Sequence, residues 1–174
     1  MRNRYNFKII GSGSTGLLLA LALSKLNLNI YITDLLTRDK IIAKEKTYAL
    51  THSTRIILEK FNIWDKLSPY LYGFDKLSIS DSVTSTSTIL RTFDLDNDLK
   101  NSKNIGWVIK HSDLMNVFFS EIDKSKYIFF KSPLELSQEK ILFDYKFIAT
   151  GAKTTNKKSF FDTLSLRKSY NQSC

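Results

Sequence analysis

Residues 9–16, Ile-Ile-Gly-Ser-Gly-Ser-Thr-Gly, determine how the rest of this sequence is interpreted. The segment holds half of the six glycines in the 174-residue chain, namely Gly11, Gly13 and Gly16. An apolar run, Phe7–Ile10, comes before the glycines, and an apolar run with helical composition comes after them. We therefore expect a strand over Phe7–Ile10, a glycine-rich turn and a helix over Thr15–Leu26, which is the start of a βαβ unit.

Each glycine of this turn has a role in binding a dinucleotide. Gly11 permits the tight turn, Gly13 lets a pyrophosphate approach the backbone, and Gly16 lets the helix pack closely on its strand. The N–H groups at the start of the helix then face the phosphates. The sequence predicts that the whole turn contacts the cofactor, through Gly11, Ser12, Gly13, Ser14, Thr15 and Gly16.

An acidic residue stands at the distance that this interpretation requires. Asp34 ends the next apolar segment, Asn29–Asp34, and its carboxylate can accept hydrogen bonds from a ribose. A turn residue at the end of a strand is the alternative interpretation of Asp34. A βαβ unit without a ligand would leave the concentration of glycine in the turn unexplained, so we predict a dinucleotide site.

The remaining pattern indicates an α/β protein with a Rossmann-like parallel sheet and a small antiparallel element. A polar connection is expected over 36–46, and His52 is expected to cap a helix or to lie at the surface, with Ser53 or Thr54 as possible helix caps. We expect further helices at 53–61 and from 112 or 113 to 124, and short antiparallel strands within 77–95. Strands are also expected at 107–110 and 127–131, a hairpin arm at 141–143 and a buried strand at 145–150.

Composition and charge narrow the classes of function. With 43% hydrophobic residues the chain is globular, and no apolar run has the length of a membrane span or the pattern of a signal peptide. The net charge is +9, but only 6 of the 26 basic residues are arginine and they are scattered, which favours a solvated surface over nucleic-acid binding. The basic surface leaves attachment to an anionic membrane open. Cys174 is the one cysteine, which excludes an internal disulfide, argues against a metal site and fits a cytoplasmic protein.

Four later segments carry a resemblance to a known family. They are Tyr48–Leu67, with its Ala-Leu-Thr-His-Ser run and Ile-Trp-Asp, then Ile105–Leu114, Phe147–Lys153 and Tyr170–Cys174. Together with the glycine turn they resemble the group A FAD-dependent aromatic-ring monooxygenases, and within that group the ubiquinone-biosynthesis hydroxylases. The resemblance implies that FAD is the cofactor and NAD(P)H and O₂ are co-substrates. The resemblance also implies that the substrate is a small aromatic molecule, a phenol that is a quinone precursor, and that the reaction is its hydroxylation.

The family pattern places three further cofactor-binding residues. Lys46 stands where the family has an arginine, His111 where it has Asn or Gln, and Gly151 in an Asp-Gly motif whose acid is here Thr150. Ser112 replaces a second family arginine. The resemblance assigns no catalytic residue and no metal ligand.

The length of the chain distinguishes it from the family, whose members have a second half with most of the substrate site. We therefore expect a C-terminally truncated arrangement, with an FAD-binding domain over 1–155, an antiparallel insert over 75–100 towards the substrate side and a polar tail over 156–174. Such a chain is either a truncated product or part of a split enzyme that a second chain or a homo-oligomer completes. An NAD(P)-binding dehydrogenase-type module and a non-catalytic remnant remain the alternatives.

Overall fold

A four-stranded parallel sheet forms the base of the molecule, in a computed structural model that describes residues 4–81, 88–94 and 104–151. Its strand order is β8-β2-β1-β9, and all three strand pairs are parallel. The bounds are Tyr5–Ile10 for β1, Leu28–Thr33 for β2, Ile128–Phe130 for β8 and Tyr145–Ile148 for β9. Strands β1 and β2 are joined through α1 (Ser14–Leu23), as the predicted βαβ unit requires.

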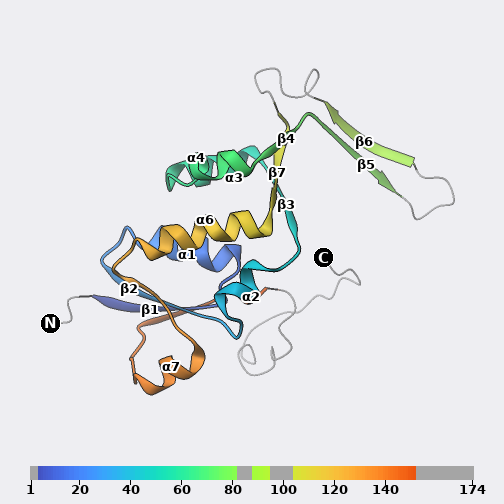
Figure 1. Cartoon of the computed structure of the whole chain (residues 1–174). Helices are drawn as coiled ribbons and strands as arrows, with labels where there is room; N and C mark the ends of the chain where they lie inside the picture. Colours follow the sequence, from blue (N-terminus) through green and yellow to red (C-terminus); the bar gives the residue numbers. More distant parts are fainter. Residues whose placement is uncertain (1–3, 82–87, 95–103, 152–174) are drawn as a thin grey trace, which may run out of the picture.

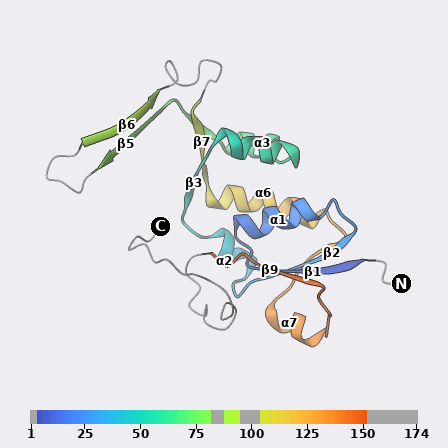
Figure 2. The same cartoon turned by 180° about the vertical axis from the view of Figure 1, so that it is seen from behind.

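Two helices cover one face of this sheet. Helix α1 and helix α6 (His111–Asp123) lie side by side above β1 and β2, while α7 (Pro133–Gln138) lies on the opposite side (Figures 1 and 2). Three strand residues on the face towards α1 and α6 are fully buried, which is typical of the centre of a parallel sheet: Ile9, Ile30 and Ile32. Helix α6 adds one apolar side to this core through Leu114, Met115, Phe118, Phe119 and Ile122.

A second, antiparallel sheet stands above the helices. Its order is β3-β7-β4, with β3 at Thr47–Leu50, β7 at Gly106–Lys110 and β4 at Tyr72–Phe74. It is reached from β2 through α2 (Arg38–Ile42) and is flanked by α3 (His52–Lys60), α4 (Trp64–Leu67) and the 3-10 helix Ser68–Tyr70. Trp64 and Trp107 meet edge-to-face, with ring centroids 4.9 Å apart, and fill the space between sheet and helices.

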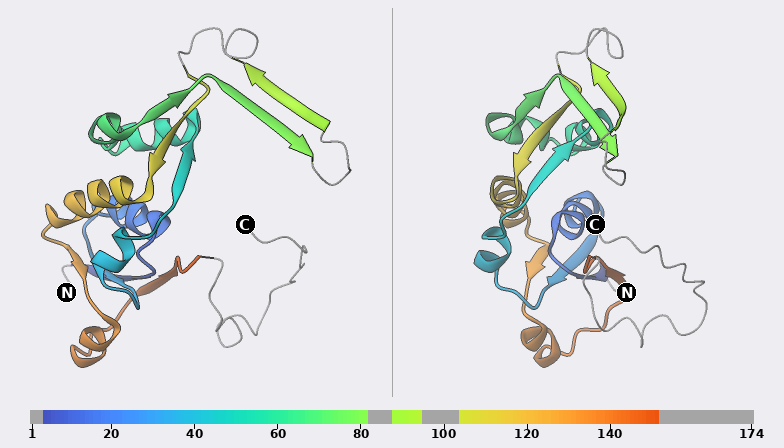
Figure 3. Two further views of the ribbon diagram at one scale, coloured as in Figure 1. Left: turned by 45° about the vertical axis from the view of Figure 1, so that its right-hand side comes forward. Right: turned by 90° about the vertical axis from the view of Figure 1, so that its right-hand side faces the viewer.

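A two-stranded ribbon extends away from these layers. It consists of β5 (Lys76–Asp81) and β6 (Thr88–Asp94), paired antiparallel, and Figure 3 shows it projecting from the end of β4. The antiparallel pairing expected within 77–95 is therefore confirmed. The tail predicted at 156–174 lies outside the described residues.

Several sequence predictions needed correction. The segment 36–46 contains α2, and β3, β4 and α7 were not expected, although Ser132 and Glu135 form a capping box that marks the start of α7. Residues 141–143 form no strand. The predicted burial of the last strand is wrong, because every residue of β9 is exposed at the edge of the sheet. Helix α3 is capped by Thr51, whose hydroxyl accepts the Thr54 N–H, and not by Ser53 or Thr54.

The described helices include none that is both long enough and apolar enough to cross a bilayer.

Candidate dinucleotide-binding site

The glycine turn lies at the carboxyl ends of β1 and β9, where backbone segments approach closely. Gly11 has a φ of +105°, and a Cβ on it would lie 2.4 Å from the carbonyl oxygen of Ala149. A Cβ on Gly16 would lie 2.0 Å from the carbonyl oxygen of Gly11. Both contacts are with backbone that has no room to move, so these two positions require glycine for the packing of the turn itself.

Gly13 differs from its two neighbours. It is the N-cap residue of α1, its φ of −68° suits any residue, and a Cβ on it would meet nothing within 4 Å. No side chain caps the helix and its first turn contains no acid. The positive end of the α1 dipole therefore faces an open space in front of Gly13, which fits a phosphate group. Ser14 is half-buried and Thr15 exposed at the same helix start.

Ser12 is fully buried and connects the turn to the acidic residue. Its backbone N–H and its hydroxyl both donate to Oδ2 of Asp34, each at 2.8 Å. Its polar groups are used inside the protein, so Ser12 orients Asp34 and does not present a side chain to a ligand.

Asp34 follows β2 directly, and its carboxylate accepts a third hydrogen bond, from the Leu36 N–H to Oδ1 at 3.1 Å. A carboxylate has about four acceptor positions, so one remains for a hydroxyl donor such as a ribose. Partial burial by itself would raise the pKa of Asp34, but the hydrogen bonds from Ser12 and Leu36 and the charge of Lys44 outweigh it and hold the pKa below its usual value. The carboxylate is thus ionised at neutral pH.

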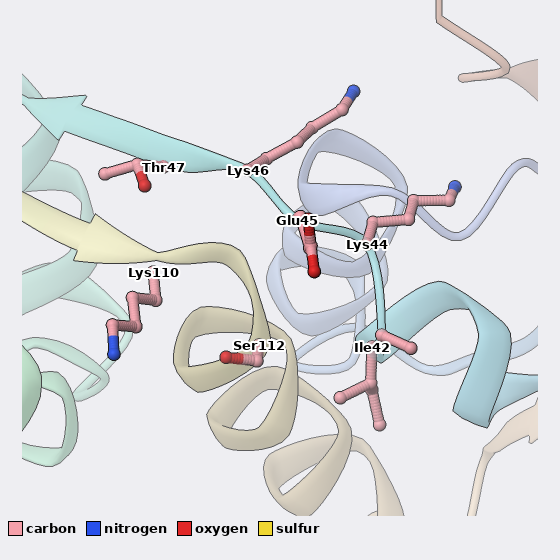
Figure 4. Close-up of a pocket in the computed structure, with 8 residues that line it drawn as sticks. Ile42, Lys44, Glu45, Lys46, Thr47, Lys110 and Ser112 are labelled. Carbon is pink, nitrogen blue, oxygen red and sulfur yellow. The ribbon is translucent and has the colours of Figure 1, made fainter.

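Lys46 lies in the exposed segment that joins α2 to β3. This segment, with Lys110 and Ser112 at the start of α6, lines a hollow of about 470 Å³. In Figure 4 the side chains of Lys44 and Lys46 extend away from Ser112, whereas the side chain of Glu45 is directed towards the part of the hollow where Ser112 lies. The charge of Lys44 contributes to lowering the pKa of Asp34, so Lys44 lies on the side of the segment that faces the end of β2.

His111 is buried and linked to three elements. Its Nε2 lies 2.7 Å from the carbonyl oxygen of Ile41 in α2, and its Nδ1 lies 2.9 Å from the hydroxyl of Tyr48 in β3. Its backbone N–H donates to the carbonyl oxygen of Lys46 at 2.8 Å. Neither ring nitrogen can contact a ligand without breaking one of these bonds, so the ring fixes the position of the Lys46 segment instead of facing a cofactor.

Gly151 has a φ of +74° and is exposed at the end of the described residues, with open space around the position of a Cβ. The structure brings the glycine turn, Asp34 and the end of β9 close together, and Lys46 lies on a neighbouring segment.

Sequence reasoning missed the roles of Lys44 and Tyr48, because the burial of His111 against α2 and β3 depends on tertiary packing. His52 is half-buried and does not cap α3, whose N-cap residue is Thr51. Its Nε2 lies 2.8 Å from the carbonyl oxygen of Asn104 and its ring packs against the edge of Trp107.

Similarity to known proteins is low at the level of sequence. No protein-family model matches the chain. A Synechocystis sp. protein, slr1300, is 24% identical over 134 residues, which are 77% of this chain and 31% of that protein.

Three solved structures share the fold. The p-nitrophenol 4-monooxygenase PnpA of Pseudomonas putida has a TM-score of 0.56 at 14% identity, over 76% of this chain and 32% of its own. PqsL of Pseudomonas aeruginosa, a probable FAD-dependent monooxygenase, has a TM-score of 0.57 at 13% identity, over 75% and 33%. The 2-methyl-3-hydroxypyridine-5-carboxylic acid oxygenase has a TM-score of 0.53 at 12% identity, over 74% and 31%. The chain spans about a third of the length of the proteins that it matches, and its fold is that of the N-terminal FAD-binding domain of such monooxygenases.

Proposed function

We propose that this chain binds FAD and is the N-terminal part of an NAD(P)H- and O₂-dependent aromatic-ring hydroxylase. The observation that carries the proposal is the open space at Gly13, in front of an uncapped α1, beside an ionised Asp34. An extended dinucleotide needs these two features at this spacing: donors for its pyrophosphate and an acceptor for its ribose.

The residues of the site have distinct roles in this proposal. The N–H groups of Gly13, Ser14 and Thr15 bind the pyrophosphate, and the remaining acceptor position of Asp34 binds the ribose. Gly11 and Gly16 shape the turn, and Ser12 orients the carboxylate. Lys46 and Lys44 offer positive charge along the anionic cofactor, His111 holds their segment in place, and Gly151 permits close backbone approach from β9.

FAD supplies the redox and oxygen chemistry when bound, while the protein binds and orients it. A quinone-precursor phenol is the proposed substrate, on the basis of the motifs in Tyr48–Leu67 and Ile105–Leu114. Two of the similar structures are named for hydroxylated aromatic compounds, p-nitrophenol and 2-methyl-3-hydroxypyridine-5-carboxylic acid, which supports this class. We place the protein in the cytoplasm, where its net charge of +9 favours peripheral contact with an anionic membrane.

The chain spans about a third of the length of the similar monooxygenases. We propose that a second chain or a homo-oligomer contributes to the substrate site. One of the similar structures is a tetrameric form of the hydroxypyridine oxygenase.

Titration of the purified chain with FAD, followed by flavin fluorescence, tests the proposal. We expect saturable binding of FAD and weaker binding of NADH in a parallel titration. Tighter binding of NADH would replace the proposal with a dehydrogenase-type module. Absence of binding by both nucleotides in a chain with a cooperative thermal transition would indicate a non-catalytic remnant.

A further inference from the structure

The face of the parallel sheet that points away from α1 carries two lysines side by side. Lys8 of β1 and Lys146 of β9 are direct partners in the parallel pairing. Ile9, the next residue of β1, faces α1, since a Cβ on Gly16 would lie 3.5 Å from its Cγ2. Because successive side chains of a strand alternate between the two faces, Lys8 and Lys146 lie on the other face. Lys8 is half-buried there, whereas Lys146 is exposed.

Two aromatic side chains lie beside Lys8 on this face. Tyr31 of β2 is the partner of Lys8 in the β1–β2 pairing, and its ring meets the ring of Phe143 edge-on, with centroids 5.4 Å apart. The Lys8 Nζ lies 5.3 Å from the centroid of the Phe143 ring. A cation–π contact of this kind favours the charged amine by only about 0.5–1 kcal/mol at an exposed site. The same rings exclude water, which favours the uncharged amine.

The carboxylates of α7 and of the segment before β9 are bonded to other groups. Their partners are Ser132 for Glu135, Lys131 for Glu139 and the Asn6 N–H for Asp144. Among the described residues, no ion pair includes Lys8 or Lys146. Lys8 is therefore a half-buried amine beside a like charge, with no counter-ion in the part of the chain that the structure describes.

This environment changes the protonation of Lys8. Burial, and to a smaller extent the charge of Lys146, holds the pKa of Lys8 below its usual range. A larger share of its amine is thus uncharged at neutral pH than in a lysine that is surrounded by water. Only the uncharged amine has a lone pair that can attack a carbonyl carbon, so the position of Lys8 favours its reaction as a nucleophile.

We propose that Lys8 is a site of acylation, with an acyl thioester as the donor. The amine nitrogen attacks the carbonyl carbon of the thioester, the carbon–sulfur bond breaks, and the thiolate leaves and takes up the proton that the nitrogen loses. The products are an amide on Lys8 and a free thiol, with no change in oxidation state. The rings of Tyr31 and Phe143 offer apolar surface to the acyl group, and loss of the Lys8 charge removes its repulsion from Lys146. The reaction does not depend on FAD binding.

Incubation of the purified full chain with acetyl-CoA at neutral pH tests the proposal. After a fixed time the chain is unfolded, the remaining amines are labelled with deuterated acetic anhydride, and mass spectrometry gives the acylated share of each lysine. The control is Lys126, which is exposed in the turn before β8, so that access alone predicts faster reaction at Lys126. One pKa unit changes the share of uncharged amine about tenfold, and the accompanying loss of nucleophilicity offsets part of this gain. We therefore expect acylation at Lys8 to be about threefold or more faster than at Lys126.

Two further measurements separate the effect of the fold from that of local sequence and access. In guanidinium chloride, where the chain is unfolded, Lys8 and Lys126 should react at equal rates. The variant Lys146→Gln removes the neighbouring charge at an exposed position, so the rate at Lys8 should fall about twofold while the rate at Lys126 stays the same. A rate at Lys8 no higher than at Lys126, a preference for Lys8 that persists in the unfolded chain, or an unchanged rate at Lys8 in Lys146→Gln would each overturn the proposal. None of these measurements includes FAD, so their outcome is independent of the proposed function.

Discussion

Ser12 and Asp34 are joined through a single carboxylate oxygen. The backbone N–H and the hydroxyl of Ser12 both lie 2.8 Å from Oδ2 of Asp34, across 22 positions of sequence. The glycine turn after β1 and the end of β2 therefore form one unit, and a change in the charge of Asp34 acts on the shape of the turn.

This link makes stability depend on the pH at acidic values. The pKa of Asp34 is lower in the folded chain than in the unfolded chain, where it is about 3.9. Its contribution to the free energy of unfolding is therefore complete above about pH 4 and is lost as the pH falls through the folded pKa. Asp34→Asn should lower the free energy of unfolding by about 1 kcal/mol at pH 7, since the carboxylate is only partly buried. Urea unfolding from pH 7 to pH 3 should show the difference between the two proteins shrinking.

Ser12→Ala is the matched control for that series. It removes the hydroxyl donor but keeps the backbone N–H, so the loss at pH 7 should be smaller than in Asp34→Asn. A difference between Asp34→Asn and the parent that stays constant down to pH 3 would contradict the role of the charge.

Substitutions of the turn glycines should distinguish an effect on FAD binding from an effect on folding. Gly13→Ala adds a methyl group where nothing lies within 4 Å, so the thermal unfolding temperature should be nearly unchanged while the affinity for FAD falls at least tenfold. Gly16→Ala forces a Cβ to 2.0 Å from the Gly11 carbonyl oxygen and should unfold or strongly destabilise the chain. Differential scanning fluorimetry and FAD titration together measure both effects. Unaltered FAD affinity in Gly13→Ala would count against the phosphate site.

Removal of the His111 ring should destabilise the junction between α2, β3 and α6. A carbonyl oxygen only accepts, so Nε2 donates to Ile41, while Nδ1 is hydrogen-bonded to the Tyr48 hydroxyl. His111→Phe leaves both partners unpaired and should cost about 2–3 kcal/mol, and Tyr48→Phe about 1 kcal/mol. Chemical unfolding of both single variants and the double variant gives the coupling energy. Additive losses would show that the two side chains do not interact.

Thr33 offers a stabilising substitution next to the site. Its hydroxyl is buried and has no hydrogen-bond partner among the residues that the structure describes, and valine has nearly the same shape. Thr33→Val should raise the free energy of unfolding by about 1 kcal/mol, because the cost of an unsatisfied buried hydroxyl is removed. Thr33→Ser keeps the hydroxyl and loses a methyl group, so it should be less stable than the parent. A less stable Thr33→Val would indicate that the hydroxyl has a partner in solution.

Elements marked by a glycine turn, an apolar run or a clear period were predictable, and several short ones were not. The βαβ unit follows from the glycine turn and its apolar flanks, and helix α6 follows from its apolar spacing. Helix α2, with five residues, and strands β3 and β4, with four and three, are too short to show a period, and their formation depends on their neighbours. For β9 the apolar composition was interpreted as burial, but burial of a strand depends on whether another element lies beside it.

By itself, the sequence determined the glycine turn and its acid, because both depend on local backbone geometry and on a spacing fixed by one βαβ unit. The tertiary structure added the contacts at the three glycines. A Cβ on Gly11 or Gly16 would lie within 2.4 Å of a backbone carbonyl oxygen, whereas a Cβ on Gly13 would meet nothing within 4 Å. Only the tertiary structure shows that Ser12 is hydrogen-bonded to Asp34 and that the His111 ring is buried against α2 and β3. Both sets of contacts join segments that are distant in the chain, so the sequence does not reveal them.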